Sequence, residues 1–142
     1  MSAVLPIAYL LTHNPGMQEL VLAESIMPGD LPINQPLPAI SIEQVDGVPH
    51  NSLSLLETGK TWRDRVQVTA HVNGPAASKP GLGYPGIYAM LNAALAACPN
   101  QQAIINGIKV LAIIPDDRGP YMSEQDTARV SQSQDFIVYW QT

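Results

Sequence analysis

The stretch RVQVTAHV, residues 65–72, decides the fold of this chain. Its apolar residues occupy every second position from Val66 to Val72, and its polar residues alternate with them from Arg65 to His71. Successive side chains of a β-strand point to opposite faces of a sheet. This period of two therefore predicts a strand that buries one face and exposes the other to solvent. The strand carries no catalytic signature.

Three further segments are typical of strands. Residues 39–45 form the first, and the pair Asp46-Gly47 after it is a turn signal. Residues 108–114 are almost wholly apolar, which predicts a central strand covered on both faces. Asn106-Gly107 before this segment is a hairpin-type turn signal. The alternation of residues 133–140 predicts the last strand.

Helical patterns occupy the N-terminal part and the middle of the chain. Residues 4–11 carry an apolar stripe at helical spacing, and Asn14-Pro15 reads as a helix cap followed by proline at the first helical position. Four prolines between Pro28 and Pro38 require extended chain. Residues 85–98 form the clearest helix, with proline in the first turn and an apolar stripe behind it.

These elements predict an α+β fold in a single domain that spans residues 1–142. We expect a mostly antiparallel sheet of about four main strands, with one long helix and short N-terminal helices packed on one face. Residues 48–64 and 115–127 are polar and mixed in composition, and both read as long loops, the first alternatively as a protruding hairpin.

Composition argues against several functional classes. The net charge is −5, only 13% of the residues are charged, and the first 59 residues contain no Lys or Arg. A protein that grips nucleic acid usually carries a basic patch, so we expect no sequence-specific nucleic-acid binding. The apolar run 3–11 is far shorter than the ~20 residues of a membrane-spanning helix, and no membrane contact is expected. A single cysteine, Cys98, allows no intramolecular disulfide.

The motifs that suggest chemistry are weak. GLGYPG at residues 81–86 matches GxGxxG, but a long loop separates it from the preceding strand and no acidic residue follows at the spacing for a ribose. The three histidines show no metal-binding spacing. The acidic residues after Pro115 fit no EF-hand. We therefore expect no cofactor, no metal, no catalytic residues and no enzymatic activity.

The order of segments resembles the tail-terminator, or tail-completion, proteins of long-tailed bacteriophages. The resemblance rests on LPAISIEQVDG (37–47), RVQVTAHV (65–72), the helix around residues 88–97 and the ending SQSQDFIVYW (131–140). Those proteins similarly begin with a short helical segment and continue with a proline-flanked strand, an Arg-Val-Gln strand, a long helix and a late strand that opens with Asp-Phe.

The resemblance implies a structural virion protein at the head–tail junction, assembled in the host cytoplasm. Such a protein forms a ring, commonly a hexamer, that caps the tail tube, stops its polymerisation and provides a docking surface for the head connector. Its partners would be further copies of itself, the tail-tube protein and the head-completion protein. The alternatives are another head–tail connector subunit or a small hydrolase whose acids lie near Asp116, paired with His50 or His71.

We expect the two polar segments to supply the protein contacts. The candidate contact residues are His50, Leu55, Lys60, Trp62, Arg63, Asp116, Asp117, Arg118, Tyr121 and Glu124.

Overall fold

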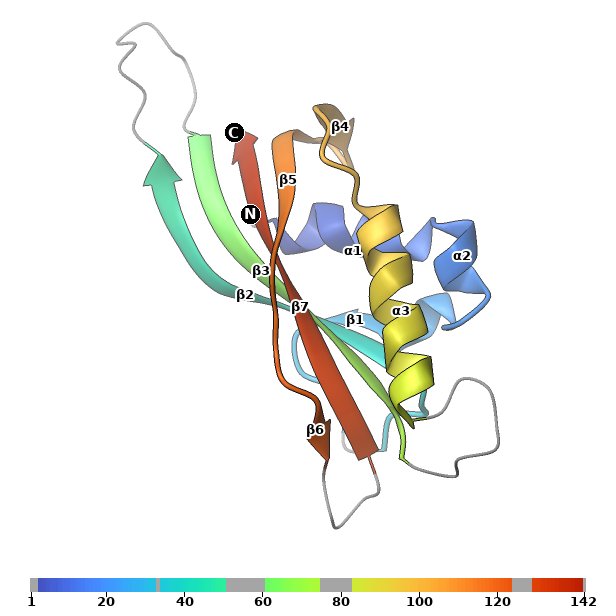
Figure 1. Ribbon diagram of the computed structural model, residues 1–142. Coiled ribbons are helices and arrows are strands. Elements are labelled where there is room, and N and C mark those ends of the chain that lie inside the picture. Colours follow the sequence, from blue (N-terminus) through green and yellow to red (C-terminus); the bar gives the residue numbers. More distant parts are fainter. Residues whose placement is uncertain (1–2, 33, 51–60, 75–82, 124–128, 142) are drawn as a thin grey trace, which may run out of the picture.

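The computed structural model describes residues 3–32, 34–50, 61–74, 83–123 and 129–141. Its centre is a curled mixed sheet, drawn in Figure 1. The strands lie in the order β1 (Ile26–Pro28), β2 (Ala39–His50), β3 (Thr61–Asn73), β7 (Arg129–Gln141), β5 (Ile108–Arg118) and β4 (Ala103–Ile105), and β6 (Met122–Ser123) pairs with β7. The β1–β2 pair is parallel, and the other pairs of neighbouring strands are antiparallel.

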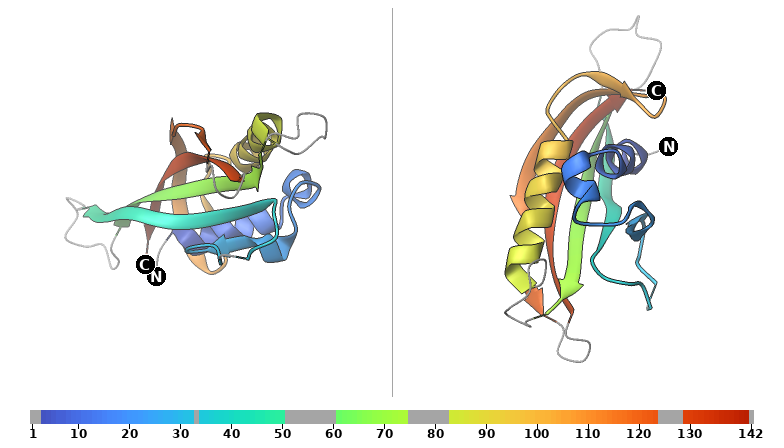
Figure 2. Two further views of the ribbon diagram at one scale, coloured as in Figure 1. Left: turned by 90° about the horizontal axis from the view of Figure 1, so that it is seen from below. Right: turned by 90° about the vertical axis from the view of Figure 1, so that its right-hand side faces the viewer.

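The helices cover one face of this sheet. They are α1 (Val4–Thr12), α2 (Pro15–Gln18), the 3₁₀ turn η1 (Ala23–Ser25) and α3 (Gly83–Ala97). The right-hand view of Figure 2 shows them in front of the strands, with α3 beside α2. Helix α3 packs on β3 and β7, while α1 packs on β1 and β2. The opposite face of the sheet has no helix on it among the described residues.

The predicted strand in residues 65–72 is confirmed and is part of β3. Val66, Val68, Ala70 and Val72 are fully buried under the helices, and the residues between them are only half-buried on the open face. Phe136, also fully buried, faces the same core from β7. One hydrophobic cluster contains these side chains together with those from α1 and α3.

The predicted fold class is wrong. Strands make up about half of the described residues, the sheet has seven strands and is mixed, and the helices are short, α3 with 15 residues being the longest. The sheet is larger than expected because polar residues continue the strands beyond their apolar parts. The pairs of the β2–β3 ladder run to His50 and Thr61, and β7 extends from Arg129.

Two local predictions about the strands are also wrong. Asp46-Gly47 is not a turn but part of β2, where a bulge shifts the register between Gln44 and Asp46. A Cβ on Gly47 would stand 2.6 Å from Asp64 Oδ1, so glycine leaves room for the Asp64 carboxylate here. Strand β5 is not covered on both faces: Ile113 is buried, whereas Ile114 is exposed on the face that carries no helix among the described residues.

Other local signals are confirmed. Asn14 caps α2, because its Oδ1 accepts a hydrogen bond from the backbone N–H of Met17 at 2.9 Å. Asn106 and Gly107 both have positive φ, at 51° and 79°, as a tight hairpin between β4 and β5 requires. The helix expected at residues 85–98 occupies residues 83–97.

The segments expected to be long loops contain strand residues. In the first segment, residues 48–50 pair with residues 61–63 as a hairpin ladder, and residues 51–60 lie outside the described residues. In the second, β5 runs to Arg118 and β6 follows at residues 122–123, while residues 124–128 lie outside the described residues.

Candidate protein–protein interfaces

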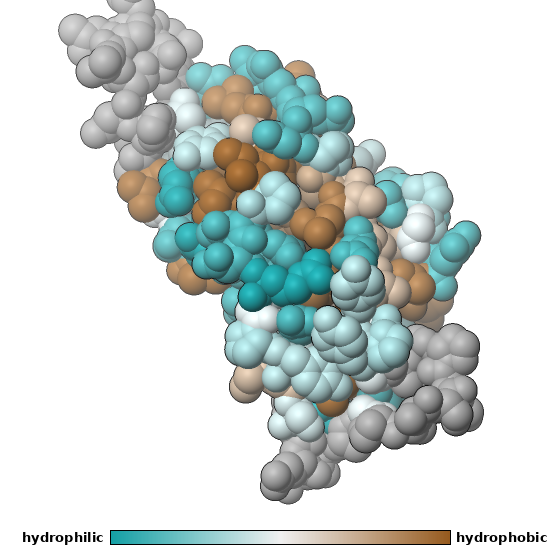
Figure 3. Space-filling model, viewed as in Figure 1, coloured by the Kyte–Doolittle hydropathy of each residue, from teal (hydrophilic) through white to brown (hydrophobic). Residues whose placement is uncertain are grey.

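The open face of the sheet carries an ion-pair cluster centred on Arg65. Its Nη1 donates to Asp116 Oδ2 at 2.5 Å and to Asp135 Oδ2 at 3.2 Å, and its Nε lies 3.9 Å from Asp46 Oδ2. The three carboxylates come from β5, β7 and β2, on both sides of β3. One guanidinium therefore links four strands across the middle of the open face, where Figure 3 shows a broad hydrophilic region.

The electrostatics of this cluster favour the charged forms. The hydrogen bonds to Asp116 and then to Asp135 raise the pKa of Arg65. Gln67, two positions along β3, donates to Asp135 Oδ1 at 3.3 Å. The cluster is partly exposed, and Arg65 offsets one of the three carboxylate charges and links the strands that carry them, so we assign the cluster to the sheet and not to a ligand.

Asp64, the residue before Arg65, points to the opposite face and is buried. Its Oδ2 accepts a hydrogen bond from Trp140 Nε1 at 2.7 Å and another from the backbone N–H of Ala3 at 3.1 Å. Only 1% of its surface is exposed. Ala3 is the N-cap of α1, where backbone N–H groups lack helical partners. Asp64 therefore fastens the start of α1 to β3 and β7.

Three tyrosines meet at the edge of the sheet that β6 forms. The rings of Tyr84 and Tyr88 are stacked with centroids 6.1 Å apart, and Tyr121 meets Tyr84 edge-on at 5.7 Å. Exposed fractions are 53% for Tyr84, 50% for Tyr88 and 40% for Tyr121, and Met122 beside them is 57% exposed. Large side chains that remain this accessible are typical of interface surfaces. We call Tyr84, Tyr88, Arg118, Tyr121 and Met122 the tyrosine edge.

The local sequence explains how this edge is built. Tyr84 and Tyr88 are four residues apart, so they share one face of α3, while Gly86 and Ile87 face the core. On the strand side, the N–H of Gly119 donates to the carbonyl of Ser133 at 2.9 Å and holds the turn before Tyr121 against β7.

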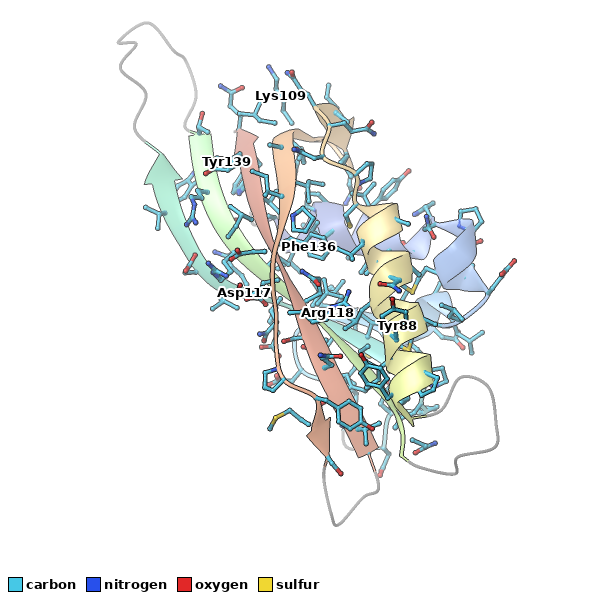
Figure 4. The ribbon with its side chains drawn as sticks, in the orientation of Figure 1. Tyr88, Lys109, Asp117, Arg118, Phe136 and Tyr139 are labelled. Carbon is cyan, nitrogen blue, oxygen red and sulfur yellow. The ribbon has the colours of Figure 1, made fainter. Side chains whose placement is uncertain are left out.

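Arg118 lies between the two parts of the tyrosine edge. Its Nε donates to Gln134 Oε1 at 3.1 Å and its Nη2 to Asn92 Oδ1 at 3.5 Å. Figure 4 shows it between β7 and α3, with Tyr88 further along the helix. Both oxygens belong to neutral amides, and within the described ranges no carboxylate forms an ion pair with this cation.

The opposite edge of the sheet carries a hollow of about 150 Å³. It lies between α2, η1 and the proline-rich segment before β2, and its lining is mainly apolar: Leu20, Val21, Leu22, Pro36, Leu37 and Pro38, with Gln18, Glu19 and Ser25. Leu22 at this hollow is 65% exposed. We call this hollow and the exposed residues at it, Glu19, Leu22 and Glu24, the pocket edge.

The pocket edge and the sheet edge beside it are acidic. Glu19 and Glu24 are exposed at the hollow, Asp30 and Glu43 are exposed further along, after β1 and on β2, and the first 59 residues hold no Lys or Arg to balance them. A side-chain hydrogen bond to Asp30 raises the pKa of Glu43, and burial and the charge of Asp30 add to this rise. Two carboxyl groups thus lie against each other beside β1, at a place where like charges repel.

The structure separates the predicted contact residues. Trp62 pairs with Trp140 across the β3–β7 ladder, and their rings stack with centroids 6.1 Å apart. Arg118 pairs with Gln134, six positions back along β7, which is roughly 20 Å at the rise of a strand. The two predicted contact segments therefore lie towards opposite ends of the sheet.

The individual residues differ in how available they are. Trp62 and Arg63 are half-buried, the carboxylate of Asp116 is bound to Arg65, and Asp117 and Tyr121 are exposed. His50 pairs with Thr61 through the backbone, and Leu55, Lys60 and Glu124 lie outside the described residues. The contact role of all these residues stays a prediction.

Sequence reasoning missed most of both edges. Tyr84 and Tyr88 lie off the apolar stripe of α3, and large aromatic residues outside that stripe are a sequence signal from which their exposure could have been predicted. Leu22 and the hollow have no comparable signal, because the lining comes from two segments that only the fold brings together.

The alternative of a small hydrolase needs a pocket that unites Asp116 with His50 or His71, and the described geometry does not provide one with His71. His71 lies six positions along β3 from Arg65, roughly 20 Å away, and its Nε2 is 3.0 Å from Ser41 Oγ. The hollow at the pocket edge contains neither Asp116 nor His71. Among the described residues, no three His, Cys, Asp or Glu side chains gather as metal ligands. No helix within the described ranges has the length and apolar character needed to cross a membrane.

Comparison with known proteins shows a likeness in structure. No family model matches the chain, and no curated protein matches it. A chain from the virion of a native gene transfer agent particle superposes with a TM-score of 0.66. The match covers 96% of this chain and 92% of that chain, at 9% sequence identity. The two chains therefore share a fold over nearly their whole lengths.

Proposed function

We propose that this chain is a structural protein of a phage-like virion and acts there as a tail terminator. Copies of the chain form a closed ring, six in number as the family resemblance implies, on the end of the tail tube. The ring stops polymerisation of the tube and offers its other side to the head connector. Its partners are the tail-tube protein, the head-completion protein and neighbouring copies, and it acts through contacts alone, without catalysis.

The observation that carries this proposal is the likeness in fold, over nearly the full length of both chains, to a component of a virion. The order of sequence segments points independently to tail terminators. The surface also suits assembly, since the exposed side chains of Tyr84, Tyr88, Tyr121 and Met122 gather at one edge of the sheet. Soluble monomers seldom leave such groups together in the open.

The proposal is tested by removing the gene from the virus and measuring tail lengths by electron microscopy. We expect tubes of abnormal, extended length that carry no heads, and normal particles when the wild-type chain is supplied. Tails of normal length beside unattached heads would indicate the alternative, a different head–tail connector subunit. Normal particles in the absence of the chain would refute both.

A second measurement uses purified protein. The mass of the chain in solution is determined with and without tail-tube protein by native mass spectrometry. A tail terminator is expected to form its ring on, or bind tightly to, the tube. An unchanged mass in the presence of assembled tubes would contradict the proposed partner.

A further inference from the structure

We infer that copies of this chain associate head to tail, with the tyrosine edge of one copy seated on the pocket edge of the next. This inference rests on the proposed function, because it names the two surfaces that close the proposed ring. It commits to a second copy of the chain as the occupant of the hollow at the pocket edge.

The positions of the two edges permit such a ring. The pocket edge adjoins β1, the first strand of the order, and the tyrosine edge adjoins β6, which lies off this order and pairs with β7. A contact between opposite edges is heterologous, so each copy keeps one free surface of each kind, and successive copies continue until the ring closes. A contact between two like edges would end at a dimer.

The shapes of the two edges are complementary. The tyrosine edge projects exposed aromatic rings, whereas the pocket edge is hollowed. A cavity of roughly 150 Å³ accommodates a benzene-sized ring, and the hollow has a volume of about 150 Å³. Tyr121 or Tyr88 entering it would place an aromatic ring against Val21, with its hydroxyl within range of the polar lining at Gln18 or Glu19.

The charges favour unlike edges over like ones. Two pocket edges in contact would bring together Glu19 and Glu24 of both copies, four carboxyl groups, without a Lys or Arg from the first 59 residues of either copy. The tyrosine edge supplies a cation, because Arg118 is held there by the neutral amides of Gln134 and Asn92. Asp117 is an exposed carboxylate on that side, so the described part of this edge carries both signs, unlike the acidic pocket edge.

Cysteine cross-linking tests this contact directly. Leu22→Cys and Tyr121→Cys are made in separate chains, mixed at high concentration and treated with a short bismaleimide. The native Cys98 is buried and does not compete. Tyr9→Cys, an exposed aromatic position on α1, replaces Tyr121→Cys in the matched control.

A head-to-tail contact gives a yield of the Leu22→Cys–Tyr121→Cys dimer about tenfold above the control, the ratio that corresponds to about 1.4 kcal/mol. Dimers that form mainly within the Leu22→Cys sample or within the Tyr121→Cys sample would show like edges in contact and overturn the inference. Yields equal to the control at all concentrations would overturn it as well.

This experiment separates the inference from the proposed function. A head-to-tail dimer together with normal particles in the gene deletion would refute tail termination and leave the contact standing. Extended tails in the deletion, with cross-linking no better than the control, would support tail termination and refute this contact.

Discussion

The two faces of the sheet treat charge in opposite ways, and adjacent residues of β3 show the difference. Asp64 faces the helices, is 1% exposed and binds two N–H groups of the protein. Arg65 faces away from them, is partly exposed to solvent and forms ion pairs with three carboxylates. Because strand side chains alternate, one residue along the chain changes the environment completely.

This contrast separates residues that hold the fold from residues that remain available for assembly. A buried charge without its partners is costly, so Asp64 is fixed by its hydrogen bonds. Exposed ion pairs contribute little, so the open face can change without loss of the fold. The surfaces that we propose for assembly lie outside the covered face, and the following variants test that division.

Replacing Asp64 with alanine is expected to have the largest effect. The change leaves the indole N–H of Trp140 and the backbone N–H of Ala3 buried without their acceptor, and each such group costs about 1–3 kcal/mol. We expect the free energy of unfolding to fall by about 2–5 kcal/mol. Urea denaturation followed by tryptophan fluorescence measures it.

Asp64→Asn is the matched control, because its amide keeps one acceptor oxygen while it removes the charge. Its loss should be clearly smaller than that of Asp64→Ala. Equal stability of Asp64→Ala and the wild type would show that the covered face does not depend on this carboxylate.

Cys98, buried on the covered face, should make the free energy of unfolding depend on pH in the alkaline range. Burial raises the pKa of its thiol to about 12, from an ordinary value of 9.0. Below pH 9 both the folded and the unfolded chain keep the proton, so the thiol does not alter stability. Between pH 9 and about 12 only the unfolded chain loses it, and the free energy of unfolding falls by about 1 kcal/mol per pH unit.

Other groups titrate in the same range, so the measurement is the difference between the wild type and Cys98→Ala. Thermal unfolding from pH 8 to 10.5 should show a steeper decline for the wild type. Parallel curves would mean that the thiol is already accessible in the folded chain.

The covered face was largely predictable from the sequence, because its signals are local. The alternation from Val66 to Val72 reports burial directly, and the Asn14-Pro15 cap and the Asn106-Gly107 turn act within a few residues. The extent of the sheet was not predictable in this way. Polar residues of β2 and β3 are held in strands by their neighbours' backbones, which a reading of their own composition cannot detect.

The ion-pair cluster and the assembly surfaces were harder to predict because their parts are distant in sequence. Arg65 and Asp116 are 51 residues apart, and Tyr84 meets Tyr121 only because α3 packs beside the β5–β6 turn. The predicted contact residue Tyr121 lies at one of these edges, but the hollow at the other edge depends on how α2 and the prolines near Pro36 fold together.

On the open face, Arg65→Met should reduce stability much less than Asp64→Ala. The variant keeps the aliphatic part of the side chain and leaves Asp46, Asp116 and Asp135 to repel one another. Because these groups are partly exposed, added salt should recover most of the loss. Denaturation of both variants at low and high salt makes the comparison, and a salt-independent loss as large as that of Asp64→Ala would place Arg65 among the residues that the fold requires.

The smallest effect on stability is expected for Tyr88→Ser. Its neighbour in sequence, Ile87, is a position where a substitution should have a large effect. Ile87 is fully buried and Tyr88 is 50% exposed on the tyrosine edge. Ile87→Ala removes core contacts and should cost about 2–5 kcal/mol, whereas Tyr88→Ser should change the free energy of unfolding by no more than about 0.5 kcal/mol. If Tyr88 serves only the contact between copies, its loss should weaken self-association at unchanged stability. A loss of stability similar to that of Ile87→Ala would assign Tyr88 to the core and leave the tyrosine edge without one of its three rings.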